Sequence, residues 1–230
     1  MCSSDGDISM LKHIVIALLS SGLLTQTPTA QTGPPQRKVE GNTITSTTNP
    51  AATIQLLDSP AYVGADRWIL YGIADCELHV FVQADAHKKV QRLYWIQFES
   101  YLPTKPELHH TYDSPRHTQI SDLDFYVDTW VEPSNEHIKP DSDVEHIHNI
   151  LQSRGFTLPT GMMSVRLVHL LDQQKRKELM FIYSEDVAST GLAVSALRNG
   201  GHAHDQWPKF EKDLIKRAEK SIAIHQLVNS

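Results

Sequence analysis

Cysteine is nearly absent from this chain, which has two in 230 residues, Cys2 and Cys76. Cys2 lies in a leader that we expect to be removed, so Cys76 would have no partner for an internal disulfide. Cys76 alternates with Leu78 and Val80. We interpret it as a small buried apolar side chain, because a nucleophilic thiol needs a nearby base and access to solvent.

Two common catalytic motifs are also missing. The chain has no Gly-x-Ser-x-Gly elbow and no glycine-rich phosphate-binding loop, which argues against the common serine hydrolases and against nucleotide triphosphatases. A formal net charge of −6 argues against nucleic acid as a partner, because its phosphates attract basic proteins. No residue pattern specifies a cofactor.

No apolar stretch reaches the length of about 20 residues that a membrane-spanning helix requires. Residues 14–24 (IVIALLSSGLL) follow Lys12 and precede a polar segment that ends at Ala30. This order is typical of a secretory signal peptide, and an ordinary buried helix is the alternative. We predict a signal peptide over residues 1–30, with Met10 as a second candidate start. The mature protein would be exported, periplasmic or extracellular, with no stable membrane span.

The composition divides the rest of the chain into two parts. Residues 31–60 are rich in Thr, Pro, Asn and Gly, which favours a flexible tether, with possible short edge strands at 39–46 and 53–57. With 40% apolar and 21% charged residues, the chain can bury an ordinary core. We therefore predict a single α+β domain over residues 61–230.

Alternating apolar and polar residues predict an antiparallel sheet. The expected fold is α+β: a single curved antiparallel β-sheet of about five to seven strands, with one inserted helix and a long C-terminal helix packed on it. The strands with the clearest alternation are expected at residues 68–73, 76–83, 90–101, 120–131, 162–171 and 177–183.

Capping residues mark the inserted helix. Ser142 and Glu145 form a capping-box pattern, and Gly155 is placed to end the helix that follows. A second, short helix is expected near residues 190–198. The C-terminal helix is expected from about Pro208, which suits a first turn, to Leu227.

Side chains two residues apart share one face of a strand, and this rule separates a polar and aromatic face from an apolar one. The predicted core face carries Cys76, Leu78, Val80, Val82, Tyr94, Ile96, Phe98, Leu123, Phe125 and Val127. The predicted functional face carries Glu77, His79, Phe81, Gln83, Trp95, Gln97, Glu99, Tyr101, Asp122, Asp124, Tyr126, Asp128 and Trp130, and Arg166 and Tyr183 could join it.

Aromatic walls with a few carboxylates, an amide and an imidazole are typical of a ligand pocket, although such a face can simply meet water. The leading hypothesis is an exported protein that binds a small organic molecule in a sheet cavity, with the loop over residues 103–119 or the terminal helix as a lid. Candidate ligand-binding residues are Glu77, Trp95, Gln97, Tyr101, Tyr112, Arg116, Tyr126, Asp128, Arg166 and Tyr183.

Two other functions remain open at this point. The first is an enzyme that acts on a small organic substrate by general acid/base chemistry, with Glu99, Asp124 or His79 as proton carrier. The second is a protein-interaction module that docks through the aromatic face. Glu77 and His79, joined by Asp124 or His117, could also bind a metal ion, but two ligands alone are weak support.

Overall fold

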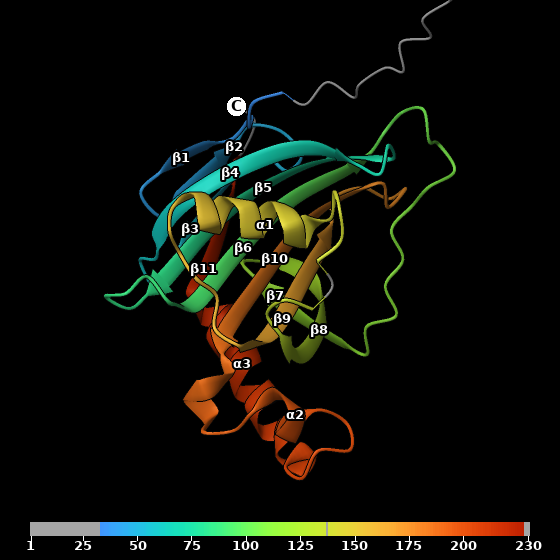
Figure 1. Ribbon diagram of the computed structural model, residues 1–230. Helices are drawn as coiled ribbons and strands as arrows, with labels where there is room; N and C mark the ends of the chain where they lie inside the picture. Colours follow the sequence, from blue (N-terminus) through green and yellow to red (C-terminus); the bar gives the residue numbers. More distant parts are fainter. Residues whose placement is uncertain (1–32, 137, 228–230) are drawn as a thin grey trace, which may run out of the picture.

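The computed structural model describes residues 33–136 and 138–227, so the predicted signal peptide lies outside the described residues. Seven antiparallel strands form the main sheet in the order β4-β5-β6-β10-β9-β8-β7, which bends and twists strongly (Figure 1). The α+β class is confirmed. The strands of the main sheet are β4 (Ala61–Leu70), β5 (Ala74–Ala84), β6 (Val90–Tyr101), β7 (Arg116–Ile120), β8 (Leu123–Pro133), β9 (Gly161–Leu170) and β10 (Lys177–Asp186).

A second sheet of four strands corrects the prediction of a single sheet. It has the order β1-β2-β3-β11, and its strands are β1 (Lys38–Glu40), β2 (Thr43–Ser46), β3 (Ala52–Leu56) and β11 (Ile222–Gln226). Ile44 pairs with Ile54, and Ile54 pairs with Ile224. All three isoleucines are buried in the core shared with the main sheet. Their burial favours packing of these strands as a second layer on the main sheet, rather than their addition to its edge.

The helices are α1 (Asp143–Ser153), α2 (Val194–Leu197) and α3 (Trp207–Ser221), with short 3-10 turns at Val187–Thr190 and His204–Gln206. The predicted cap of α1 is confirmed, because the Ser142 hydroxyl accepts a hydrogen bond from the Glu145 amide at 3.3 Å. The Glu145 carboxylate accepts a hydrogen bond from the Asp141 amide at 2.8 Å. In the capping-box pattern the donor would be the amide of the next residue, Ser142. Gly155 follows the helix with a φ of 74°, as a C-terminal cap requires.

Two predicted boundaries were wrong. The C-terminal helix ends at Ser221 rather than Leu227, because Ile222 and Ile224 are buried as alternate residues of β11 against β3. The strand expected over residues 120–131 is divided by Ser121 and Asp122, whose φ angles of 48° and 67° form a two-residue hairpin turn. The result is the β7–β8 hairpin.

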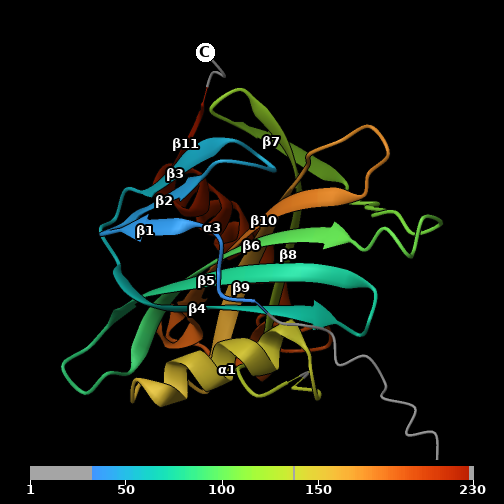
Figure 2. The same ribbon diagram turned by 90° about the horizontal axis from the view of Figure 1, so that it is seen from above.

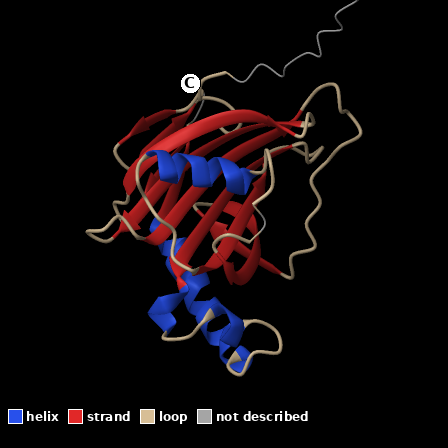
Figure 3. Cartoon of the chain, in the orientation of Figure 1, coloured by secondary structure: helices blue, strands red, loops and turns tan. Residues whose placement is uncertain are grey.

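The main sheet is covered on both faces. In Figure 2, α1 lies on one side of the sheet, whereas the second sheet and α3 lie on the other; Figure 3 shows the same layers coloured by secondary structure. Two apolar cores correspond to these layers. Within the described residues, no helix is both long enough and apolar enough to cross a membrane.

Candidate functional site

The face of the main sheet beneath α1, here called the α1 face, gathers most of the predicted polar and aromatic residues. Register places Cys76 opposite Glu99, and Glu99 opposite Glu178. The next row runs from Leu78 through Gln97 to Met180. Facing partners in an antiparallel sheet share a face, so a polar strip crosses the centre of the α1 face.

The prediction for β5 was wrong, because its functional and core faces are exchanged. A register shift at Gln83 and Ala84 leaves Gln91 as an extra residue in β6. Without this bulge, Cys76 would pair with Phe98, as the sequence-based grouping assumed; with it, Cys76 shares a face with Glu99. A shift of one residue moves every side chain of a strand to the other face.

Four predicted site residues lie away from the α1 face: Glu77 and His79, because of this bulge, and Tyr183 of β10 and Arg116 of β7. The Glu77 carboxylate lies 3.0 Å from His79 Nε2 and also accepts hydrogen bonds from the Gln36 and Arg37 amides. Tyr183 donates its hydroxyl proton to Glu185 at 2.5 Å. Arg116 pairs with Glu211 of α3 at 2.5 Å.

The α1 face holds a group of side chains that we call the polar cluster: Gln97, Glu99, Tyr112, Asp143 and Glu178. Gln97 donates to Glu99 at 3.3 Å, and its amide also stabilises the ionised form of Asp143 at the start of α1. Tyr112 donates to Glu178 at 2.6 Å. The cluster thus joins β6, β10, α1 and the loop before β7.

Burial raises the pKa of the carboxyl groups in the polar cluster. The pKa of Glu99 is raised to about 7, first by burial and then by the charge of Asp143. The pKa of Glu178 is raised to about 8, again by burial and then by the charge of Glu99. The pKa of Asp143 is also raised by burial. Both glutamates can therefore carry a proton near neutral pH.

The long loop between β6 and β7 closes one end of the α1 face. Arg176 donates hydrogen bonds at 2.8 Å to the carbonyls of Lys105 and Leu108. His110 of the loop lies 3.0 Å from Glu178 and stacks on Tyr101 with ring centroids 4.5 Å apart. The loop, which the sequence analysis suggested as one of two possible lids, thus contacts Glu178 and Tyr101 of the main sheet and is anchored at several points.

Unpartnered polar atoms concentrate around the polar cluster. In the described part of the chain, six buried side-chain nitrogen or oxygen atoms have no hydrogen-bond partner, and four of them belong to residues of this region. Buried polar groups in native proteins are almost always hydrogen-bonded, to protein, water or a ligand. The four are Trp68 Nε1, His110 Nε2, Asp143 Oδ1 and Arg166 Nε.

An apolar hollow of about 70 Å³ lies farther along the same face, between α1 and the sheet. Its lining includes Trp95, Trp130, Met162 and Ile182 from the sheet and Ile147 from α1. The Trp95 indole donates to Gln97 at 2.9 Å, and Gln97 donates to Glu99. A continuous hydrogen-bonded chain therefore connects the wall of the hollow with the polar cluster.

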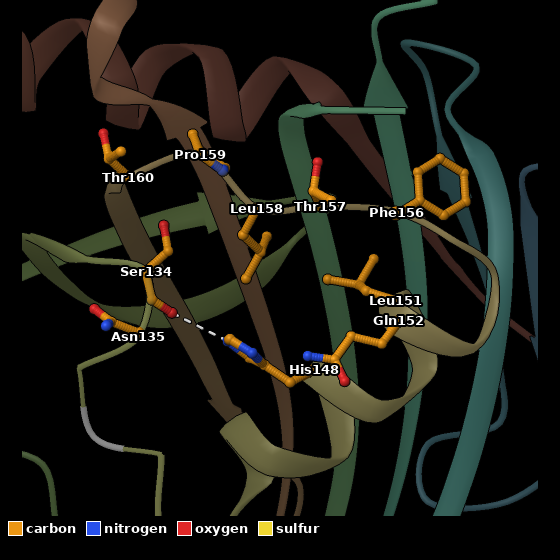
Figure 4. Close-up of a pocket in the computed structure, with 10 residues that line it drawn as sticks. All are labelled: Ser134, Asn135, His148, Leu151, Gln152, Phe156, Thr157, Leu158, Pro159 and Thr160. Carbon is orange, nitrogen blue, oxygen red and sulfur yellow. Dashed lines mark hydrogen bonds between the residues drawn. The ribbon is translucent and has the colours of Figure 1, made fainter. Parts of the chain in front are cut away.

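The hollow adjoins a groove of about 400 Å³ at the C-terminal half of α1. Figure 4 shows the side chains of this groove, with His148 hydrogen-bonded to the Ser134 carbonyl, at 3.0 Å. Ser134, His148 and Leu158 line both spaces. The groove offers an approach to the hollow from the surface.

The remaining predicted residues divide between the site and its surroundings. Arg166 pairs with Asp128 at 2.7 Å and lies over the Tyr112 ring, 5.2 Å from its centroid. Tyr126 packs near the same ring at 5.4 Å. Asp124 is exposed and accepts from Gln119 at 2.9 Å, away from the polar cluster.

Sequence reasoning had singled out His110, as one of several acid/base-capable groups of the long loop, but it missed Glu178, Asp143 and Trp68. Glu178 and Trp68 lie in strands that were predicted, but only the pairing of β10 with β6 and of β4 with β5 places them in the row of Glu99. Asp143 is brought there by the packing of α1 on the sheet, for which the sequence carried no signal.

Of the suggested metal ligands, Glu77 and His79 lie 3.0 Å apart on β5, but Asp124 of β8 and His117 of β7 do not join them. Within the described residues no three His, Cys, Asp or Glu side chains gather closely enough to hold a metal ion.

Comparison with known proteins gives no relative on which to base a function: no family model, no curated protein and no solved structure matches this chain.

Proposed function

We propose that this protein is exported and binds a small organic molecule between α1 and the main sheet. The observation that carries the proposal is the concentration of buried, unpartnered polar atoms around the Glu99–Glu178 pair. A guest in this layer would supply the missing partners. The apolar hollow beside it suits the rest of such a molecule, since ligand sites combine apolar walls with a few converging polar groups.

General acid/base catalysis at the same place is the second candidate. Glu99 and Glu178 are direct cross-strand neighbours, and their pKa values of about 7 and about 8 suit groups that give and take protons near neutral pH. An enzyme should convert the molecule that it binds, and Glu99→Gln should abolish turnover while binding persists. Docking of a protein partner has less support, because Trp95 is only 8% exposed and lies under α1.

Filling the hollow is expected to prevent binding. A molecule from a small-compound library that binds the wild type should raise its melting temperature by about 5 °C at a hundredfold excess over Kd. Val144 lines the hollow, so the larger side chain of Val144→Phe should remove most of this shift. The control is Ile138→Phe, at a position that is 41% exposed. Equal shifts in Val144→Phe and the wild type would place binding elsewhere.

Export predicts a processed N-terminus. The denatured mass of the protein purified from its own cells should correspond to a chain that begins near Gln31. A mass that corresponds to a chain starting at Met1 or Met10 would contradict export. The proposal of a binding site under α1 would be unaffected by that result.

A further inference from the structure

The hollow between α1 and the main sheet presents an apolar wall, because most of its polar groups are bonded to one another. The Ser164 and Ser184 hydroxyls lie 2.8 Å apart in a mutual hydrogen bond. The Trp130 indole donates to Glu132 at 2.8 Å, and the Trp95 indole donates to the polar cluster. The occupant that suits such a wall is hydrocarbon, which needs no hydrogen-bond partner.

The volume of the hollow limits the shape of its occupant. It measures about 70 Å³, whereas an apolar cavity that binds benzene inside a protein measures about 150 Å³. A slender alkyl group therefore fits, and an aromatic ring does not. The rest of a bound molecule has room in the adjoining groove, whose volume of about 400 Å³ is that of an ordinary ligand pocket.

The groove is polar but has no aspartate, glutamate, lysine or arginine among the ten residues that line it in the described part of the chain (Figure 4). An ion that entered it would lose hydration and meet no opposite charge, which is costly. Neutral hydrogen-bonding groups suit the groove better. Its own polar side chains are hydroxyls, amides and one imidazole, from Ser134, Asn135, His148, Gln152, Thr157 and Thr160.

Ser134 lies where the hollow meets the groove, and it has an unused hydroxyl. The residue lines both spaces, and its Oγ is buried without a hydrogen-bond partner. His148 bonds to the Ser134 carbonyl, and Figure 4 shows the hydroxyl turned away from that contact. Buried hydroxyls are almost always bonded to protein, water or a ligand. A hydroxyl both donates and accepts, so an amide or alcohol group of a ligand can complete it.

Building on the proposed function, we infer that the bound molecule is neutral and amphipathic. Its slender alkyl end fills the hollow, an amide or hydroxyl group bonds to Ser134 Oγ, and its remaining polar part lies in the groove. A carboxylate at the same place would be repelled by Glu132, which lines the hollow. An ammonium group would have to give up its water beside a carboxylate that the Trp130 indole already engages.

Isothermal titration with three probes that share one chain tests the polar end: hexanamide, hexanoate and hexylamine. Hexanamide should bind at least about tenfold more tightly than either ion, because burial of an unpaired charge is costly. Ser134→Ala should weaken hexanamide binding by about fivefold, the size of one neutral hydrogen bond. The matched control is Ser153→Ala, at an exposed serine of α1 outside the groove, which should bind hexanamide as the wild type does.

A fourth probe, 3-phenylpropanamide, tests the size of the hollow, since a ring replaces the end of the chain. The wild type should bind it at least about fivefold more weakly than hexanamide, because the ring exceeds the hollow. Val144→Ala removes two methyl groups from the wall and should reduce this difference to about twofold or less.

The outcomes separate this inference from the proposed function. If hexanoate, hexylamine or the phenyl probe binds the wild type as tightly as hexanamide, or if Ser134→Ala binds hexanamide unchanged, the inference is wrong and the binding site stands. If no probe binds, and none raises the melting temperature of the wild type, both proposals fail. Melting curves establish that each variant is folded before its affinity is compared.

Discussion

Replacing Glu77 with glutamine is expected to destabilise the protein by about 3–5 kcal/mol, the cost of breaking a buried ion pair. Arg37 lies 3.0 Å from Glu77 and its side chain is only 11% exposed, so the substitution would leave its charge unpaired and largely shielded from water. The same carboxylate holds the Gln36 and Arg37 amides and contacts His79. Glu77 thus fastens the segment before β1 to the main sheet, and urea unfolding would measure its loss.

The pKa of Glu77 gives this prediction a pH dependence. Burial acts to raise the pKa, but hydrogen bonds from His79, Gln36 and Arg37 and the Arg37 charge outweigh it and lower the pKa to about 2. A carboxyl group with a lowered pKa stabilises the fold at pH values above its ordinary pKa. The difference between wild type and Glu77→Gln should therefore be full above about pH 5 and decrease as the pH falls toward 2.

Two comparisons make the Glu77 prediction specific. Glu40→Gln removes the exposed pair with Lys38 and should change stability little, since exposed pairs contribute little. Combining Glu77→Leu with Arg37→Met removes both buried charges and should recover part of the loss. If Glu77→Gln is as stable as the wild type, Glu77 is not the anchor of the N-terminal segment.

Stability should also fall as the pH rises from 5 to 9, because of Glu99 and Glu178. In the unfolded chain these groups have an ordinary pKa near 4.5, whereas in the folded protein the pKa values are about 7 and about 8. The folded state therefore binds more protons across this range, and its advantage is lost as the pH rises through the folded pKa values. The two groups are neighbours and titrate as a pair, and we expect their combined loss between pH 5 and pH 9 to be on the order of 6 kcal/mol.

The double variant Glu99→Gln with Glu178→Gln should show a much flatter profile over the same range, because neither amide can ionise. The free energy of unfolding is measured by urea denaturation at intervals of one pH unit for both proteins. Parallel profiles for the wild type and the double variant would contradict the raised pKa values, and with them the acid/base candidate.

Local signals in the sequence predicted the elements of the fold well. Strand alternation located most strands of the main sheet, and Ser142 and Gly155 marked the ends of α1 because capping depends on residues adjacent in sequence. The second sheet was not predicted as a separate layer. Its strands β3 and β11 pair residues far apart in the chain, and no local pattern encodes such a pairing.

The residues of the candidate site were predicted in part. Strand register explains why the residues of β6 were grouped correctly and those of β5 were not. The alternation of β6 correctly grouped Trp95, Gln97, Glu99 and Tyr101, since neighbours on one strand fix that grouping. Glu77 and His79 were wrongly assigned to the face that carries Trp95 and Glu99. The bulge at Gln91 shifts β5 by one residue relative to β6, so that Glu77 and His79 lie on the opposite face. Glu178 lies beside Glu99 because β10 pairs with β6. Alternation within one strand does not indicate which strand will pair with it.

Mass spectrometry of the purified protein under native and denaturing conditions tests the central proposal, a small organic molecule held under α1, most directly. We expect extra mass of a few hundred daltons in the native spectrum alone after incubation with a cell extract of small molecules, and its loss in the variant Val144→Phe. Identical native and denatured masses after that incubation, or extra mass that persists in Val144→Phe, would contradict it.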